Sequence, residues 1–482
     1  MPISLDRLER VLNPSAVAVV GDKRASGYMW LNSLKTFAGN LYSVQVDPRE
    51  VEGIAELGVP NFASLTEIPE PVDYVVCAVP RKIAPIIVRD CIAAGVGGVT
   101  LFTSGFAETG EDEGVALQEQ IGALAREADL ALIGPNCMGL HNPRLGVRFH
   151  RDQPHGQTGD VGFISQSGTH GMHFSLVGAT RGVVCSTLIS FGNGIVLEAA
   201  DYLDYLAADA GTRIIAMYIE GARDGRRFVR SLRAAAARKP VVVWKGGQTR
   251  AGSTAARSHT AALATDQAVW EAIMRQAGAL SVASLDEMID VVHALQRTKP
   301  GRGRRVALMA MTGGQSVALA DAFARAGWEV PRFAESTYAQ LGEFFNVIGG
   351  SYQNPLDMAG TIMTDRAALD RLLDLMADDP NVDAVAMEVS ATFAVQRWER
   401  DPEELAALIR SLRRFRERSD KPFVTALHPS YVEAAALKAR DALQEAGLPV
   451  FPSFERAANA LGKSAALRPS LHPGRAGERG PA

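Results

Sequence analysis

The chain has 482 residues and a formal net charge of −4 at pH 7; 47% of its residues are hydrophobic and 22% are charged. These values are ordinary for a globular protein, and they give no reason to expect a nucleic-acid or membrane partner. No apolar run reaches the roughly 18 residues that a membrane-spanning helix needs, and the length suits about three domains.

Short apolar, β-branched runs alternate with longer helical patterns along the whole chain. The predicted strands are, in order, Ala16–Val20, Tyr74–Val79, Gly98–Phe102, Ala131–Ile133, Val161–Ile164, Val184–Ile189, Arg213–Ile219, Pro240–Trp244, Val306–Met311, Ala384–Glu388 and Phe423–Leu427. The runs are continuously apolar, so both faces of each sheet should be covered. Alternation of strands and helices predicts an α/β fold with parallel sheets.

The pattern breaks twice, which predicts three consecutive parallel-sheet domains. Arg144–Gly159 is rich in His, Pro, Gly and Gln, and Arg297–Arg305 is basic and rich in Gly, so both are expected to be linkers. The predicted domains span residues 1–145, 159–298 and 304–465. Residues 466–482 are rich in Pro, Gly and Arg, which is typical of a disordered tail.

The N-terminus and the cysteines indicate a cytoplasmic location. The first residues, MPISLDRLERVLNP, lack the apolar core of a signal peptide. The four cysteines have no paired short spacing, so we expect reduced thiols. They are Cys77, Cys91, Cys137 and Cys185.

The first predicted strand ends in a tight turn at Gly21. A turn of this kind points backbone N–H groups at an anionic ligand, and Lys23 and Arg24 could bind phosphates. The three spaced glycines of a dinucleotide fingerprint are absent, which disfavours a nicotinamide cofactor. A solvated turn explains these residues equally well.

Two further loops of the first segment follow strands. One contains Ser104 and Gly105, and the other runs through Gly134, Pro135 and Asn136. Loops at the carboxyl ends of strands line the ligand crevice in open α/β sheets, so both are candidate binding loops. The alternative is that the glycine and proline residues only form turns.

In both the second and the third segment, the first strand is followed by a turn that contains glycine and residues with hydroxyl groups. Ser167, Gly168 and Thr169 open one helix, and Gly313 and Gly314 open the other after Thr312. Both turns are candidate phosphate-binding sites, unless small residues merely fit a tight turn there. The glycines flanking Ser167 do not complete a hydrolase nucleophile elbow.

Three histidines of the second segment are candidates for chemistry. His170 and His173 are three residues apart on one predicted helix, but no third ligand is evident nearby, so no metal site is predicted. His259 ends a loop rich in glycine and hydroxyl groups. A histidine can act as a nucleophile when a carboxylate orients its other nitrogen, and Glu220 is the candidate orienter. A solvent-facing loop histidine is the simpler alternative.

Taken together and in order, these motifs resemble the NDP-forming acyl-CoA synthetase superfamily, which includes succinyl-CoA synthetase and the ADP-forming acetate:CoA ligases. The resemblance covers about residues 6–465. It is carried by Ser104–Glu108, Gly134–Gly139, Ser165–Gly168, Tyr218–Gly221, Ser258–Thr260, Thr312–Gly314 and Asn354–Asp357. It implies a Rossmann-like CoA-binding domain followed by two flavodoxin-like domains.

The resemblance also implies roles for the candidate residues. His259 would be the phosphorylated nucleophile and Glu220 its carboxylate partner. The phosphate and acyl group would lie at two helix N-termini, formed by Ser167, Gly168 and Thr169 and by Gly313 and Gly314. CoA would be bound by Gly21, Lys23, Arg24, Pro80, Ser104, Gly105 and Asn136.

The implied activity is that of the alpha-type subunit of an acid:CoA ligase. The three domains and the tail account for the whole chain, so we expect a separate ATP-grasp subunit to handle ATP or GTP with Mg²⁺, and we expect an oligomer. The turn at Gly21 has fewer Gly and Ser/Thr residues than relatives have, and Ala261 stands where relatives often have Gly. The alternative function is a CoA- or acyl-CoA-binding protein that no longer catalyses ligation.

Overall fold

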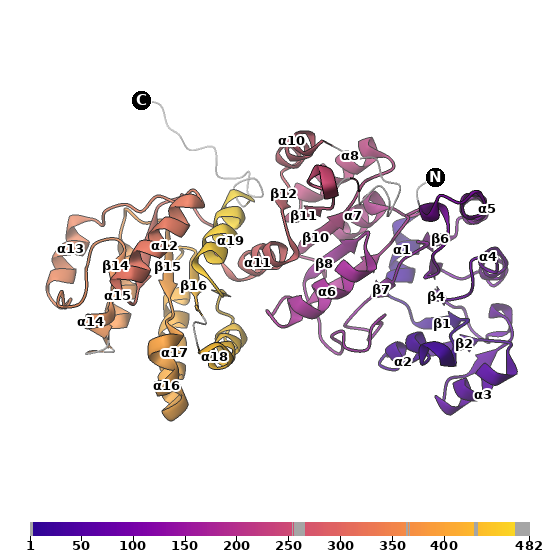
Figure 1. Cartoon of the computed structure of the whole chain (residues 1–482), viewed down its shortest axis with the longest axis horizontal. Helices are drawn as coiled ribbons and strands as arrows, with labels where there is room; N and C mark the ends of the chain where they lie inside the picture. Colours follow the sequence, from indigo (N-terminus) through magenta and orange to yellow (C-terminus); the bar gives the residue numbers. More distant parts are fainter. Residues whose placement is uncertain are drawn as a thin grey trace. The chain divides into compact units, whose positions relative to one another are not determined.

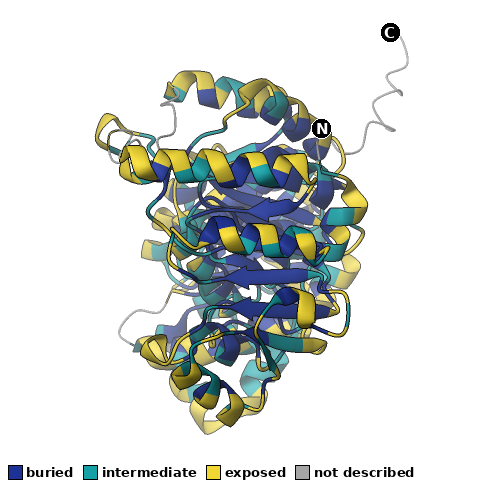
Figure 2. Cartoon of the chain, turned by 90° about the vertical axis from the view of Figure 1, so that its right-hand side faces the viewer, coloured by how far each residue is buried: buried dark blue, intermediate teal, exposed yellow. Residues whose placement is uncertain are grey.

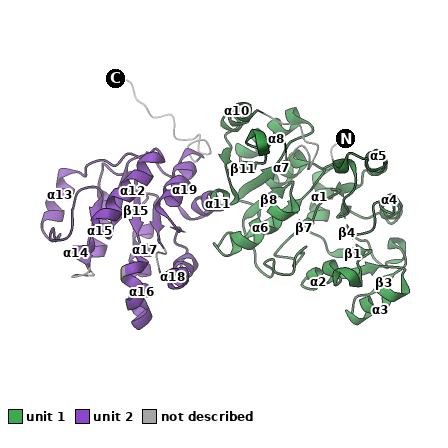
Figure 3. Ribbon diagram, in the orientation of Figure 1, with its two compact units in different colours: residues 1–288 green, residues 289–482 purple. Residues whose placement is uncertain are grey.

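Helices and strands alternate along the described part of the chain, as the computed structural model in Figure 1 shows. The structure describes residues 3–252, 254, 266–362, 365, 367–428 and 432–467. The chain forms two compact units, residues 1–288 and residues 289–482 (Figure 3). Among the described residues, no helix combines the length and the apolar character that crossing a membrane requires.

The first sheet of unit 1 has six parallel strands in the order β3-β2-β1-β4-β5-β6. Its strands are β1 (Ala16–Val20), β2 (Asn40–Val44), β3 (Asn61–Phe62), β4 (Tyr74–Cys77), β5 (Gly98–Leu101) and β6 (Ala131–Ile133). Its helices are α1 (Leu5–Leu12), α2 (Met29–Leu34), α3 (Pro48–Glu56), α4 (Ala84–Ala93) and α5 (Asp112–Glu127). From β1 the chain adds strands on one side, and from β4 it adds them on the other, so the strand order reverses between β1 and β4. Open α/β sheets bind ligands beside the carboxyl ends of the two strands at such a position.

The second sheet of unit 1 has the order β12-β11-β10-β8-β9-β7. Its strands are β7 (Gly139–His141), β8 (Val161–Ser165), β9 (Cys185–Ser190), β10 (Ile214–Ile219), β11 (Val241–Lys245) and β12 (Leu280–Val282). Its helices are α6 (Gly168–Ala179), α7 (Ala199–Ala208), α8 (Gly225–Ala236), α10 (Gln267–Ala277) and α11 (Leu285–Arg297), the last of which continues into unit 2. All pairings are parallel except that of β7 with β9.

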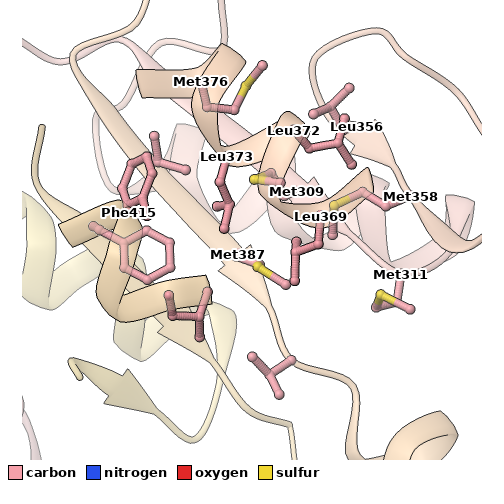
Figure 4. Packing of buried hydrophobic residues seen from close by; sticks show 14 of the residues in the cluster. Met309, Met311, Leu356, Met358, Leu369, Leu372, Leu373, Met376, Met387 and Phe415 are labelled. Carbon is pink, nitrogen blue, oxygen red and sulfur yellow. The ribbon is translucent and has the colours of Figure 1, made fainter. Parts of the chain in front are cut away.

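Unit 2 contains one parallel sheet in the order β14-β13-β15-β16-β17. Its strands are β13 (Val306–Ala310), β14 (Leu356–Asp357), β15 (Ala384–Glu388), β16 (Phe423–Ala426) and β17 (Val450–Phe451). Its helices are α12 (Gly313–Arg325), α13 (Glu335–Gly342), α14 (Ala359–Ile362), α15 (Ala367–Asp378), α16 (Ala391–Arg400), α17 (Pro402–Arg418), α18 (Glu433–Glu445) and α19 (Phe454–Leu467). Methionine and leucine side chains fill much of the core on one side of this sheet (Figure 4).

Burial explains why the apolar runs form strands. All five residues of β1, β8, β13 and β15 are buried, as a sheet covered on both faces requires. Figure 2 shows the strands as a buried layer behind helices whose outer faces are exposed. In α8, for example, Phe228, Leu232 and Ala235 are buried while arginines occupy the outer positions. The predicted α/β class with mainly parallel sheets is therefore confirmed.

Two features differ from the expectation. The strand β7 is antiparallel to β9, so the second sheet is mixed. The predicted linker Arg144–Gly159 is packed into unit 1, because Phe149 is fully buried and the Gln153 amide donates a hydrogen bond of 2.9 Å to Ser175 Oγ. The predicted domain boundaries stay a prediction, and the expected tail beyond residue 467 lies outside the described residues.

Candidate active site

The carboxyl ends of β8 and β10 lie side by side in the second sheet. The two strands pair in parallel. The chain leads from β8 to its neighbour β9 on one side and from β10 to its neighbour β11 on the other side, so the strand order reverses between β8 and β10. Ligand crevices of open α/β sheets form at such a position. The predicted turn Ser167–Gly168 follows β8, and Glu220 follows β10, so the fold brings these two predicted elements to one edge.

The turn after β8 begins a helix in a regular manner. Ser167 is the N-cap of α6, and its Oγ accepts a hydrogen bond of 3.3 Å from the His170 amide. Gly168 and Thr169 occupy the first helical positions, whose amides have no partner within an α-helix. With the helix dipole, such amides favour an anion at this end of α6.

Glu220 is held by two neighbours that the sequence did not single out. The Gln166 side-chain oxygen accepts hydrogen bonds from the amides of Glu220, at 2.7 Å, and Gly221, at 3.2 Å. The Tyr218 hydroxyl donates a hydrogen bond of 3.1 Å to Glu220 Oε1. Glu220 is only 7% exposed, so its carboxylate has a fixed position close to the α6 turn.

The loop after β11 passes directly over Glu220 and Tyr218. A Cβ atom on Gly246 would lie 2.6 Å from the Tyr218 hydroxyl and 3.0 Å from Glu220 Cγ, so only glycine fits without a shift. This loop leads toward residues 255–265, which lie outside the described residues and include His259. The pairing of His259 with Glu220 therefore stays a prediction.

His170 packs in an aromatic group rather than pointing toward His173. Its ring centroid lies 4.4 Å from that of Tyr218 and 4.6 Å from that of Trp244. His173, one turn further along α6, is exposed. Within the described parts of the chain, no three His, Cys, Asp or Glu side chains are grouped as metal ligands would be.

The loops after the strands of the first sheet converge at its carboxyl edge. A Cβ on Gly21 would lie 2.6 Å from Val79 Cγ1, which places the turn after β1 beside Pro80. The Thr103 hydroxyl donates to the Val79 carbonyl, and the Asn136 amide donates to the Thr103 carbonyl at 3.0 Å. The fold thus brings together the regions of Gly21, Pro80, Ser104 with Gly105, and Asn136.

The turn after β1 differs in detail from the expected strand–turn–helix junction. The helix α2 begins only at Met29, and the Asp22 carboxylate accepts hydrogen bonds from the amides of Trp30 and Leu31 at 3.0 and 2.9 Å. Burial raises the pKa of Asp22. Lys23 is exposed, whereas the Arg24 guanidinium hydrogen-bonds the Tyr28 hydroxyl, an interaction that raises the pKa of Arg24. An anion here would meet Lys23 and loop amides rather than the start of α2.

The candidate loop after β6 and the candidate turn before α6 contact each other. A Cβ on Gly168, the first residue of α6, would lie 2.6 Å from Met138 Cγ, so the loop after β6 packs against the start of α6. The Met138 amide donates a hydrogen bond of 3.1 Å to Ser190 Oγ, which fixes that loop on β9. Met138 follows Asn136 by two residues. The predicted CoA loop and the predicted phosphate turn are therefore neighbours.

In unit 2, Gly313 and Gly314 open α12, as expected from the sequence. Thr312 is the N-cap, and its Oγ1 accepts a hydrogen bond of 3.3 Å from the Gln315 amide. Two acidic groups lie close by: Glu388 accepts a hydrogen bond of 2.8 Å from the Met311 amide, and Asp357 Oδ2 lies 3.5 Å from a Cβ position on Gly313. Burial, and secondarily the charge of Asp357, raises the pKa of Glu388.

Comparison with known proteins agrees with this arrangement. A family model for a CoA binding domain matches residues 15–143, and one for a succinyl-CoA ligase like flavodoxin domain matches residues 158–295. The alpha subunit of acetate–CoA ligase (ADP-forming) II from Pyrococcus furiosus is 33% identical over 460 residues, which span 94% of this chain and 96% of the relative. This chain belongs to the ADP-forming acetate–CoA ligase family.

Other members of the family match over similar lengths. The alpha subunit of acetate–CoA ligase (ADP-forming) I from Pyrococcus furiosus is 32% identical over 94% of this chain and 96% of its own length. Acetate–CoA ligase (ADP-forming) I from Archaeoglobus fulgidus is 34% identical over 80% of this chain, but the match spans only 55% of that longer relative. A dinucleotide-forming acetyl-coenzyme A synthetase from Ca. Korarchaeum cryptofilum, solved with phosphate and ADP, has a TM-score of 0.83 at 27% identity and covers 96% of this chain and 97% of its own.

In this acetate–CoA ligase family member, the sequence identified the candidate loops but missed the residues that hold them. Gln166 stands within a recognised motif, and only the strand pairing of β8 with β10 shows that it binds the Glu220 backbone. Tyr218 is two residues before Glu220, and period-two alternation along a strand could have placed both on one face. Nothing in the sequence indicates that Met138 contacts Gly168.

Proposed function

We propose that this chain is the alpha-type subunit of an acid:CoA ligase, which forms acyl-CoA from a carboxylic acid and CoA through a phosphohistidine. Membership in the acetate–CoA ligase family and the match to a CoA binding domain support this assignment. The Pyrococcus relatives that it matches over almost their full length are themselves named alpha subunits. We propose a separate ATP-grasp subunit as the partner, and the buried free thiols of all four cysteines fit a reducing cytoplasm.

The observation that carries the proposal is the contact between Met138 and Gly168. CoA bound along the first sheet would pass the loop of Asn136, and this loop packs on the first residue of α6. Glu220 is held directly after β10, which pairs with β8 beside the α6 turn. A thiol leaving the first crevice therefore reaches a site that has helix amides for a phosphate and a carboxylate for a histidine.

The proposed reaction proceeds in three steps. An imidazole nitrogen of His259 attacks the terminal phosphorus of ATP on the partner subunit, and ADP leaves; Mg²⁺ would enter with the nucleotide. A carboxylate oxygen of the acid then attacks the phosphohistidine, which yields an acyl phosphate and frees His259. Finally the CoA sulfur attacks the acyl carbon, its thiol proton is lost and inorganic phosphate leaves. Division into steps activates an unreactive carboxylate before the thiol attacks.

Each predicted site residue has a role in this scheme. Glu220 would orient His259 and stabilise its positive charge during transfer. The amides of Gly168 and Thr169, capped by Ser167, would bind the phosphate, and Gly313 and Gly314 would present a second helix N-terminus. Phosphoryl transfer depends mainly on positioning and on electrostatic stabilisation, which such amides supply. CoA would be bound by Gly21, Lys23, Arg24, Pro80, Ser104, Gly105 and Asn136.

A phosphorylation assay tests the proposal. With an ATP-grasp partner and labelled ATP, the chain should hold phosphate in an acid-labile, base-stable linkage, and His259→Ala should abolish it. His259→Asn should also fail, because an amide nitrogen is not nucleophilic. His173→Ala is the matched control, since His173 is an exposed histidine of α6 and should leave labelling unchanged.

Two outcomes would contradict the mechanism. The purified chain alone should make no acyl-CoA from ATP, so robust ligation by the single chain would remove the need for a partner. Full turnover by His259→Ala with the partner present would end the phosphohistidine mechanism. It would favour a CoA-binding protein that does not catalyse ligation. A melting curve and a CoA titration for each variant separate loss of chemistry from loss of fold.

A further inference from the structure

The loop after β9 leaves the second sheet of unit 1 and runs along the first sheet. Every second amide of this loop donates a hydrogen bond to a carbonyl in or directly after β6. The donors are Asn193, Ile195 and Leu197, and their acceptors are Pro135, Gly134 and Leu132 at 3.0, 3.2 and 3.4 Å. Strand edges are paired through alternate residues in this way, so the loop of residues 192–197 covers the edge of β6.

The same loop lies directly against the candidate CoA loop after β6. A Cβ atom on Gly192 would lie 2.2 Å from the Asn136 carbonyl oxygen, and Gly192 has a φ of 52°, so glycine is required here. Two residues earlier, Ser190 Oγ accepts a hydrogen bond of 3.1 Å from the Met138 amide. On its other side, the loop is held by the Arg126 guanidinium of α5, which donates a hydrogen bond of 3.0 Å to the Ile195 carbonyl.

The side chain of Asn193 reaches across to the first sheet. Its Nδ2 donates hydrogen bonds to Glu108 Oε2 at 2.7 Å and to Gln118 Oε1 at 2.9 Å, which uses both of its hydrogens. Its Oδ1 is buried and has no hydrogen-bond partner within the described part of the chain. Burial of an unsatisfied oxygen lowers stability, so stability alone does not explain an asparagine at this position.

Glu108 connects Asn193 to the other candidate CoA loop. While Oε2 accepts from Asn193, Oε1 accepts hydrogen bonds from the amides of Gly105, at 2.6 Å, and Phe106, at 3.2 Å. Gly105 has a φ of 96°, a conformation that side chains other than glycine rarely adopt. The Glu108 carboxylate therefore holds the turn that carries the exposed Ser104.

We propose that Asn193 is a positioning residue for CoA binding. From the second sheet it fixes Glu108, and Glu108 keeps the turn of Ser104 and Gly105 in the shape that receives CoA. The inference rests on the proposed CoA site, and it adds to that site a loop from outside the CoA-binding sheet. Through Ser190 and Asn193, the end of β9 holds both candidate CoA loops at the place where the thiol would pass toward α6.

Calorimetric titration of CoA into the full-length chain and its variants tests this role. Asn193→Ala removes a hydrogen bond to a charged group, so it should weaken CoA binding by roughly tenfold. Asn193→Asp places a second carboxylate against Glu108 and should weaken binding further, because like charges repel. Asn193→Asp combined with Glu108→Gln should recover most of the affinity. The glutamine Oε1 can still accept from the two loop amides, and its Nε2 can donate to the new carboxylate.

A matched control makes the same change elsewhere on the first sheet. Asn40 is exposed at the amino end of β2, and its Nδ2 donates a hydrogen bond of 2.6 Å to Glu70 Oε1. Asn40→Asp therefore sets two carboxylates against each other at the edge opposite the CoA loops, and it should leave CoA affinity unchanged.

The possible outcomes separate the positioning role from the CoA site itself. Unchanged CoA affinity in Asn193→Ala, or a double variant that binds no better than Asn193→Asp, would overturn the role of Asn193. A packing role alone would not be restored by a change at Glu108. If a melting curve shows that Asn193→Asp is unfolded, Asn193→Ala decides the question. Failure of the unaltered chain to bind CoA would instead contradict the proposed CoA site.

Discussion

The hydroxyl of Tyr218 donates a hydrogen bond of 3.1 Å to the carboxylate of Glu220, two residues further along the same strand direction. Residues two apart on a strand share a face, so this pair arises from the local backbone. Burial raises the pKa of Tyr218, which keeps its hydroxyl protonated as a donor. This hydrogen bond fixes the position of the Glu220 carboxylate, which we propose orients His259.

Removal of this hydrogen bond should slow phosphorylation but leave the fold intact. A hydrogen bond to a charged group contributes about 1.5–3 kcal/mol, so Tyr218→Phe should reduce the rate of labelling by roughly tenfold or more with unchanged CoA affinity. Tyr202→Phe is the control, because the Tyr202 hydroxyl is buried and has no hydrogen-bond partner among the residues that the structure describes. Equal labelling rates for the two variants would show that Tyr218 does not position Glu220.

Gly246 should not tolerate alanine, since a Cβ there would lie 2.6 Å from the Tyr218 hydroxyl. Overpacking of this kind costs about 1–3 kcal/mol, and the shift would displace Glu220 as well. We expect Gly246→Ala to lower both the free energy of unfolding, measured in denaturant, and the labelling rate. Gly225→Ala adds the same methyl group at the start of α8, where it meets no neighbouring atom within 4 Å, so it should lower neither.

The first crevice should bind CoA in preference to NAD. The three-glycine fingerprint of a dinucleotide site is absent. In addition, the Asp22 carboxylate already accepts hydrogen bonds from the amides of Trp30 and Leu31 at the start of α2. A nicotinamide dinucleotide in the usual Rossmann position would place its pyrophosphate against this carboxylate, whereas we propose that the phosphates of CoA bind Lys23 and the loop amides instead. Calorimetric titration with both ligands decides the point, and tighter binding of NAD would refute it.

Stability should fall in mild acid because of His141. Burial, together with the nearby charge of Arg148, lowers its pKa from 6.5 to about 4. Between these values the unfolded chain takes up a proton that the folded chain does not, so the free energy of unfolding decreases as the pH falls from 6.5 to 4. The full loss is about 3 kcal/mol.

The pH dependence of a His141→Gln variant provides the measurement. Its unfolding free energy should vary less between pH 6.5 and 4 than that of the unaltered chain. His155→Gln replaces an exposed loop histidine and should keep the original slope. Parallel curves for all three proteins would mean that His141 does not titrate as its burial requires.

The sequence alone determined the class of the fold and most of the strands at its centre. Three strands have the predicted ends: Ala16–Val20, Ala131–Ile133 and Ala384–Glu388. A continuous apolar run can be recognised locally in the sequence, and burial in a sheet covered on both faces stabilises it as a strand. The resemblance to the acyl-CoA synthetase superfamily, read from ordered motifs, is confirmed by the comparisons. Strand β2 was missed because its exposed and half-buried positions carry no apolar run.

Tertiary structure decided the contacts that join distant segments. Gln166 binds the Glu220 backbone only because β8 pairs with β10, and Met138 meets Gly168 only because β7 joins the second sheet antiparallel to β9. In unit 2, residues of β15, α16 and α17 line a cavity whose form depends on how these elements pack. Local sequence fixes which residues favour a strand or begin a helix, but the distance between two side chains from separate elements depends on strand order and packing, which no single segment encodes.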